Sequence, residues 1–211
     1  MSNIKKFLTE SSSFVETLTE QTETGKQLYI TGIFAQAEVC NGNGRIYPKH
    51  VLERAVEKYN EEYVSRRVAL GELNHPENPH VNPAEGAILI ESLHWEGNNV
   101  IGKAKVLNTP KGQIIRGLLE GGYNMGVSTR GLGELKESNG KKIVESFMLT
   151  AIDAVSNPSG PNCYVNPIME SVSWVEKDGV WVPIEEATKE LVKKEIIDED
   201  LLLSKLSKIF K

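Results

Sequence analysis

The sequence AILIESLHWEGNNVIGKAKVL, residues 87–107, decides the fold class. Apolar side chains fill two β-type runs, Ala87 to Trp95 and Val100 to Leu107. Between the two runs lies Gly97-Asn98-Asn99, which is typical of a tight turn between neighbouring antiparallel strands. These residues therefore predict a β-hairpin.

Further strands are predicted on both sides of this hairpin. Leu28 to Val39 alternates in a way that indicates a strand covered on both faces. Gly126 to Leu135 and Ile143 to Val155 form a second predicted hairpin, joined across Ser138-Asn139-Gly140. The strands outnumber the helices and do not alternate regularly with them, which argues against a doubly wound parallel sheet.

Two helices are expected among these strands. The first begins at Pro48 and has an apolar face made of Val51, Leu52, Ala55, Val56, Tyr59 and Tyr63. The second has Thr109 as its N-cap and Pro110 as its first residue, and it ends at Gly121-Gly122. The sequence therefore predicts an α+β fold, with an antiparallel β-sheet or barrel core flanked by helices.

The 211 residues suggest one compact domain with extra segments at its ends. Residues 1–26 are rich in Ser, Thr and Glu and are expected to form a mobile N-terminal arm. The few apolar residues of this segment could make a short helix but not a core; they are Phe7, Leu8, Phe14, Val15 and Leu18. Residues 27–172 are expected to form the domain itself. Residues 173–211 are predicted to be a C-terminal extension, where a Lys177-Asp178-Gly179 turn leads into an amphipathic helix carrying Leu202, Leu203, Leu206, Ile209 and Phe210.

Composition excludes several classes of protein. The formal net charge of −5 and the lack of a basic run disfavour a nucleic-acid partner. No apolar run approaches the ~20 residues that span a bilayer, and no export signal is recognised, so an intracellular protein without a membrane partner is expected. Cys40 and Cys163 are too far apart for a metal-type pair and are interpreted as packed thiols. No phosphate-binding glycine motif occurs.

Three residues stand in contexts that suggest catalysis. His75 lies in the loop entry Gly71-Glu72-Leu73-Asn74-His75-Pro76, which could hold an imidazole for proton transfer. Ser128 lies among small residues and two positions before Arg130, which fits a nucleophile with a nearby oxyanion donor, although glycine beside serine is also common in plain turns. Asp153 sits in an apolar run, where a carboxylate needs a partner. It would either orient a histidine or cap a neighbouring turn.

A metal site is an alternative use of the same loop. Glu72, His75 and His80 carry oxygen and imidazole ligands of the kind that zinc accepts. Their spacing matches no familiar zinc hydrolase, and two prolines stiffen the loop.

Several motifs between about residues 28 and 171 occur in an order that is typical of one known family. They are Gly32-Ile33-Phe34, Ala37-Glu38, Asn43-Gly44-Arg45-Ile46-Tyr47-Pro48, Ala69-Leu70-Gly71-Glu72-Leu73-Asn74-His75-Pro76, Gly126-Val127-Ser128-Thr129-Arg130-Gly131-Leu132-Gly133, Asp153-Ala154-Val155 and Pro158-Ser159. In these motifs the chain resembles the prohead core proteases of T-even-type tailed bacteriophages, which are related to the herpesvirus assemblins. The resemblance implies an assemblin-like fold and a serine protease.

The resemblance implies roles for individual residues. Ser128 is the expected nucleophile and His75 the expected base. Thr129 stands where the family usually has a second serine, and Thr129, Arg130 and Gly131 are expected to bind the oxyanion or the substrate. Assemblins use a second histidine as the third member, but no histidine follows Ser128 here, so Asp153 is inferred from its position and chemistry.

The resemblance also implies cleavage after Glu, with an apolar residue two positions before it and a small residue after it. Self-cleavage is therefore expected at two accessible sites, Glu10-Ser11 and Glu170-Ser171. A cation is needed where the substrate Glu binds. Arg130 is the first candidate for this cation, and Arg66, Arg67 and Arg116 are the alternatives.

The expected substrates are phage scaffold, core and capsid proteins, cut inside the prohead in the host cytoplasm. No cofactor and no metal ion are expected, and the enzyme is expected to be a homo-oligomer or to depend on assembly. A rival interpretation is a non-enzymatic core scaffold protein, in which the apolar stripe of the C-terminal extension packs against other core proteins.

Overall fold

The computed structural model describes residues 4–14, 16–22, 25–138, 140–155, 173–177 and 180–183. The chain divides into two compact units, one comprising Phe7–Glu170 and the other comprising Met1–Lys6 with Ser171–Lys211. All residues of the candidate site belong to the larger unit.

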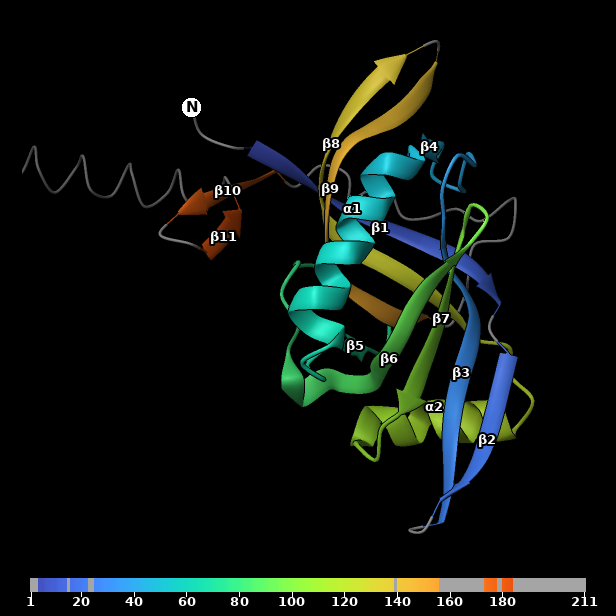
Figure 1. Ribbon diagram of the computed structural model, residues 1–211. Coiled ribbons are helices and arrows are strands. Elements are labelled where there is room, and N and C mark those ends of the chain that lie inside the picture. The colour runs from blue at the N-terminus through green and yellow to red at the C-terminus, as the bar shows by residue number, and fades with distance from the viewer. Residues whose placement is uncertain are drawn as a thin grey trace, which may run out of the picture. The chain divides into compact units, whose positions relative to one another are not determined.

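Two sheets form the larger unit (Figure 1). The first has the order β1-β8-β9-β4 and consists of β1 (Ile4–Phe14), β8 (Gly126–Ser138), β9 (Lys141–Val155) and β4 (Arg45–Ile46). The second has the order β2-β3-β7-β6-β5 and consists of β2 (Glu16–Thr22), β3 (Gly25–Gln36), β7 (Asn99–Val106), β6 (Gly86–Glu96) and β5 (Leu70–Glu72). Neighbouring strands of the second sheet are antiparallel, as are β8 and β9, whereas β4 runs parallel to β9. Both predicted hairpins, β6–β7 and β8–β9, are confirmed.

The two predicted helices are present, and each packs against a sheet. Helix α1 (Lys49–Tyr59) continues into a π-helical turn, η1 (Asn60–Val64), and packs on β9 (Figure 1). Helix α2 (Pro110–Glu120) packs on β6 and β7, and the Thr109 hydroxyl accepts a hydrogen bond from the N–H of Gly112 at 3.1 Å. The predicted α+β class is confirmed. Among the described residues, no helix has both the length and the apolar character needed to cross a membrane.

The two sheets meet where β5 reaches β9. Leu73 forms a parallel bridge with Ala154, and the N–H of Asn74 donates to the Ala154 carbonyl at 2.7 Å. Gly71 makes this approach feasible, because a Cβ atom there would lie 2.0 Å from the carbonyl oxygen of Ile152. This seam between β5 and β9 brings residues 72–75 to the side chains of the first sheet.

The N-terminal segment differs from the expectation for residues 1–26. Instead of an arm with a short helix, it contains β1 and β2, which pair within the two sheets. Phe7 and Leu8 are buried, and Leu8 lies against Gly133 of β8. Phe7 and Leu8 are therefore part of the domain's core.

The side chain of Glu10 is buried among polar side chains and is not accessible to solvent. It forms an ion pair with Arg45 and accepts hydrogen bonds from Asn43 Nδ2 at 2.7 Å and from the Tyr47 hydroxyl at 3.0 Å. Burial raises the pKa of Glu10 above its ordinary value, although the positive charge of Arg45 opposes this shift. The expectation that the Glu10-Ser11 bond is accessible is therefore wrong for the folded domain.

The smaller unit contains a short antiparallel hairpin that was not predicted. Strands β10 (Ser173–Lys177) and β11 (Val180–Pro183) flank the expected turn, and β10 pairs with residues 4–6. The predicted amphipathic helix lies outside the described residues, as does Cys163. Cys40 is exposed, so its interpretation as a packed thiol is wrong.

Gly71→Ala should destabilise the domain by about 1–3 kcal/mol, because its methyl group would overlap the backbone of β9 at the seam. Gly117→Ala is the matched control. Gly117 is in α2, and a Cβ atom added there would meet no other atom within 4 Å, so this change should be neutral or stabilise by up to about 1 kcal/mol. Urea unfolding measures both variants, and equal effects would show that the seam is not tightly packed.

Candidate active site

Strand register places Ser128 and Asp153 opposite each other. Ser128 of β8 and Asp153 of β9 are direct partners in the antiparallel ladder. Directly opposed residues on neighbouring strands present their side chains to the same face of the sheet. Both are 0% exposed, so a hydroxyl and a carboxylate from distant parts of the sequence share one buried position.

His75 completes a hydrogen-bonded chain with these two residues. Its Nδ1 lies 2.8 Å from Asp153 Oδ2, and its Nε2 lies 2.5 Å from Ser128 Oγ. An ionised carboxylate only accepts hydrogen bonds, so Nδ1 carries the proton and the lone pair of a neutral ring is at Nε2. The Ser128 hydroxyl therefore donates to Nε2, which is the geometry needed for proton removal from the serine.

The seam fixes the position of the imidazole. Asn74, directly before His75, has a positive φ of 64°, a conformation that asparagine tolerates better than most residues. Its N–H is bonded to β9 one residue beyond Asp153. The backbone carrying the base is thus attached to the strand that carries the acid.

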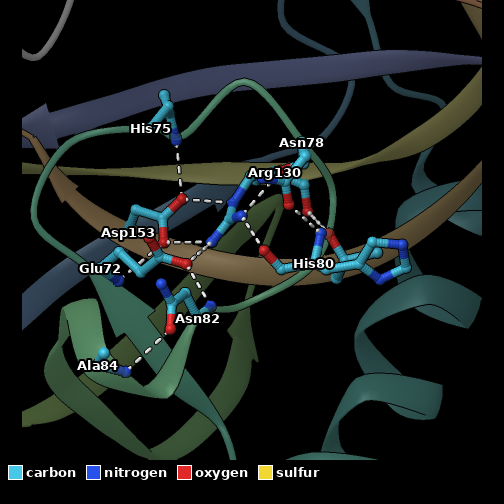
Figure 2. A network of polar contacts seen from close by, with 9 residues as sticks. Glu72, His75, Asn78, His80, Asn82, Ala84, Arg130 and Asp153 are labelled. Atoms are coloured by element: carbon cyan, nitrogen blue, oxygen red, sulfur yellow. Dashed lines mark hydrogen bonds and ion pairs between the residues drawn. The ribbon is translucent and has the colours of Figure 1, made fainter. Parts of the chain in front are cut away.

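Arg130 lies at the centre of the network behind the imidazole (Figure 2). It is 0% exposed, and it contacts both oxygens of Asp153, from Nε at 2.8 Å and from Nη2 at 3.0 Å. Its Nη1 donates to the backbone carbonyls of Asn78 and His80, each at 2.9 Å, and Nη2 also donates to Glu72 at 3.2 Å. One guanidinium therefore orients the Asp153 carboxylate and holds the loop that follows His75.

Glu72 links the same loop to the network. Its backbone N–H donates to Asp153 Oδ1 at 2.9 Å, and its Oε1 accepts from the N–H of Asn82 at 2.8 Å as well as from Arg130 (Figure 2). Asp153 consequently accepts four hydrogen bonds from His75, Glu72 and Arg130. These four donors occupy both carboxylate oxygens and leave the side chain one orientation.

The structure brings together His75, Ser128 and Asp153, as predicted. Arg130 is corrected: its five N–H groups point to protein acceptors, so it is not placed to bind an oxyanion or a substrate Glu. Thr129 is buried and its side chain points to the face of β8 opposite Ser128, because alternate strand residues face opposite sides. Gly131 lies against the Met148 carbonyl. A role for the backbone of Thr129 or Gly131 stays a prediction.

The metal alternative does not match these contacts. Both ring nitrogens of His75 are engaged, and Glu72 is used by Arg130 and Asn82. Within the described part of the chain, no group of three His, Cys, Asp or Glu residues could hold a metal ion. Glu170 and Ser171 lie outside the described residues.

Sequence reasoning missed the positioning role of Arg130 and the part played by Glu72. One signal was present, because Ser128 and Arg130 are two apart in a predicted strand and so share a face. A buried arginine on that face needs carboxylates, and Asp153 and Glu72 were the acidic residues in neighbouring apolar segments.

Ser128, His75 and Asp153 are joined by hydrogen bonds in this order. This order of hydroxyl, imidazole and carboxylate is the class of site found in Ser-His-Asp hydrolases. Comparison with known proteins is more specific. A family model described as prohead core protein serine protease (Peptidase_S77) matches residues 8–173, so the chain belongs to this family of proteases.

Two relatives illustrate the similarity. The chain is 48% identical over 145 residues to the prohead core protein protease of Enterobacteria phage T4, covering 66% of this chain and 68% of the relative. The solved structure of the bacteriophage T4 capsid assembly protease, gp21, matches with a TM-score of 0.66 and 40% identity, covering 72% of this chain and 99% of that one.

Arg130→Lys should destabilise the domain by about 3–5 kcal/mol, because lysine keeps the charge but cannot satisfy two carboxylates and two carbonyls in a fixed fork. Urea unfolding followed by circular dichroism measures the change. Arg66→Lys, at an exposed position, is the control and should change stability by less than about 0.5 kcal/mol. If the two variants unfold alike, Arg130 does not hold the site together.

Proposed function

We propose that this chain is a serine endopeptidase in which Ser128 is the nucleophile, His75 the general base and Asp153 the carboxylate that orients the base. The observation that carries the proposal is the continuous chain of hydrogen bonds from Ser128 Oγ through the imidazole to Asp153. Membership of the prohead core protein serine protease family supports it.

The proposed reaction follows from the positions of the protons. His75 Nε2 takes the proton of Ser128 as its oxygen attacks a peptide carbonyl, and the resulting imidazolium gives that proton to the leaving amine. Water then hydrolyses the acyl-enzyme with the same base. Asp153 holds Nδ1–H in place throughout, and Arg130 keeps Asp153 from rotating away from the ring.

The proposed substrates are scaffold, core and capsid proteins, cut inside the phage prohead in the host cytoplasm. The name of the T4 relative as a capsid assembly protease supports this, and so does the family description. Cleavage after Glu is proposed from the motif resemblance. Because Arg130 is fully used inside the protein, the cation that binds the substrate Glu is sought among Arg66, Arg67 and Arg116, of which Arg66 and Arg67 are exposed.

Dependence on assembly is part of the proposal. The side chain of Ser128 is fully buried and that of His75 is 14% exposed, so a peptide carbonyl must gain access to the hydroxyl before reaction. Contacts with other chains in a homo-oligomer or an assembling prohead would provide the energy for this opening.

Ser128→Ala should abolish peptide cleavage, by at least about a thousandfold, while leaving the unfolding transition unchanged. Cleavage of prohead proteins and reaction of Ser128 with a fluorophosphonate measure the loss, and Ser65→Ala is the control at an exposed serine. Retained turnover in Ser128→Ala would remove the nucleophile assignment. No labelling of the unaltered protein, even within proheads, would favour the scaffold interpretation, whereas chelator-sensitive turnover would favour a metal hydrolase.

Self-cleavage should occur at one of the two sites expected from the sequence and not at the other. Mass spectrometry of the incubated full chain should find the bond after Glu170 cut and the bond after Glu10 intact, because Glu10 is held in β1 by Arg45, Asn43 and Tyr47. Mild urea that releases β1 should then expose the Glu10 bond. Equal cutting of both bonds in the folded protein would contradict the protection, and Ser128→Ala is the control for cleavage by other proteases.

A further inference from the structure

Glu72 is not part of the proposed triad of Ser128, His75 and Asp153, but its carboxylate belongs to the same buried cluster as Asp153. Glu72 is 3% exposed, and its side chain contacts Arg130, which in turn contacts both oxygens of Asp153. Figure 2 shows Glu72 and Asp153 on the same guanidinium, with His75 beyond Asp153. The charges of these four side chains are therefore coupled in a site with little water.

We propose that Glu72 sets the proton affinity of His75 by restoring the negative charge that Arg130 neutralises on Asp153. This inference rests on the proposed function, because it concerns the base of that reaction. Glu72 acts through Arg130 and Asp153, and its hydrogen bonds reach neither the nucleophile nor the face of the imidazole that a substrate would approach, so it is a positioning residue.

A charge count gives the direction of the effect. One guanidinium and two carboxylates leave one net negative charge while the imidazole is neutral, and the cluster becomes neutral when the imidazole is protonated. Without the charge of Glu72, the cluster would start neutral and would carry an unbalanced positive charge once His75 took the serine proton. Unbalanced buried charge is costly, so Glu72 favours the imidazolium that forms during acyl transfer.

Asp153 without Glu72 would stabilise an imidazolium at His75 less well. Its Oδ2 accepts from both His75 Nδ1 and Arg130 Nε, at 2.8 Å each, and Arg130 Nη2 holds Oδ1. The attraction of Asp153 for an imidazolium is therefore opposed by a cation in direct contact with the same carboxylate. A second carboxylate on the far side of that cation offsets the opposition.

The other titratable groups around the cluster do not replace Glu72. Tyr59 of α1 is buried, and its pKa is raised well above its ordinary value, first by burial and then by the charge of Asp153, so the phenol stays neutral. His80, on the loop after His75, directs its backbone carbonyl at Arg130 and is exposed, as is Glu77. Exposed charges are screened by solvent, so they act weakly on the ring.

Glu72 could instead act only by anchoring the loop, and this role would respond differently to substitution. Its Oε1 accepts from Asn82 N and from Arg130, and a glutamine retains an oxygen at this position while removing the charge. Glu72→Asp does the reverse, since it keeps the charge but shortens the reach to Asn82. The two variants therefore separate charge from loop anchoring.

The experiment is an NMR titration of the His75 ring, together with the pH dependence of Ser128 phosphonylation by a fluorophosphonate, in which the serine oxygen bonds to phosphorus and fluoride leaves. In Glu72→Gln both midpoints should move to lower pH by about one unit, a tenfold loss of imidazole protonation, because the charge that favoured the imidazolium is gone. In Glu72→Asp the midpoints should stay near those of the unaltered protein. If Glu72→Gln does not fold, Glu72→Asp and Glu72→Asn provide the same comparison at shorter length.

The outcomes test the role of Glu72 and the serine mechanism separately. An unchanged ring titration in Glu72→Gln, or an equal shift in Glu72→Asp, overturns the role of Glu72. If the ring titration shifts as expected but Ser128 is never phosphonylated, even within proheads, the serine mechanism fails while the coupling between Glu72 and His75 stands.

Discussion

The contact between Arg130 and Asp153 is the interaction on which the site depends. It joins β8 to β9 by two hydrogen bonds within a buried part of the first sheet. The same guanidinium binds the carbonyls of Asn78 and His80, so it also fixes the loop that follows His75. A buried arginine is costly unless every donor has an acceptor. This requirement holds Asp153, the loop after His75, and strands β8 and β9 in one arrangement.

The seam between the sheets explains how His75 reaches Ser128. Ser128 and Asp153 are fixed by register within one sheet, whereas His75 arrives from the end of β5 in the other. Gly71 permits the close approach, and the Asn74 bond to Ala154 sets where the loop leaves the seam. Geometry at the active site is therefore a consequence of sheet packing rather than of the loop sequence alone.

The N-terminal strand gives the domain a further buried ion pair, apart from those of Arg130. Glu10 and Arg45 join β1 to β4, and Leu8 fills the core beside β8. A segment whose composition resembles an exposed arm is in this way part of a sheet. Glu10 is stable there because its carboxylate finds a cation and hydrogen-bond donors at short range.

The sequence by itself determined the β6–β7 and β8–β9 hairpins through alternation and turn residues, and the ends of α2 through Thr109 and Gly121. The sequence also marked Ser128 and His75 through its resemblance to a known family, and Asp153 through its position and chemistry. It did not predict the burial of Glu10, the part played by Glu72, or the inward direction of Arg130. Those features depend on partners far away in the chain, such as Arg130 and Glu72, which are 58 residues apart. Local patterns specify periodicity and turns, but only the packed tertiary structure decides which distant charges meet, because burial makes their pairing obligatory.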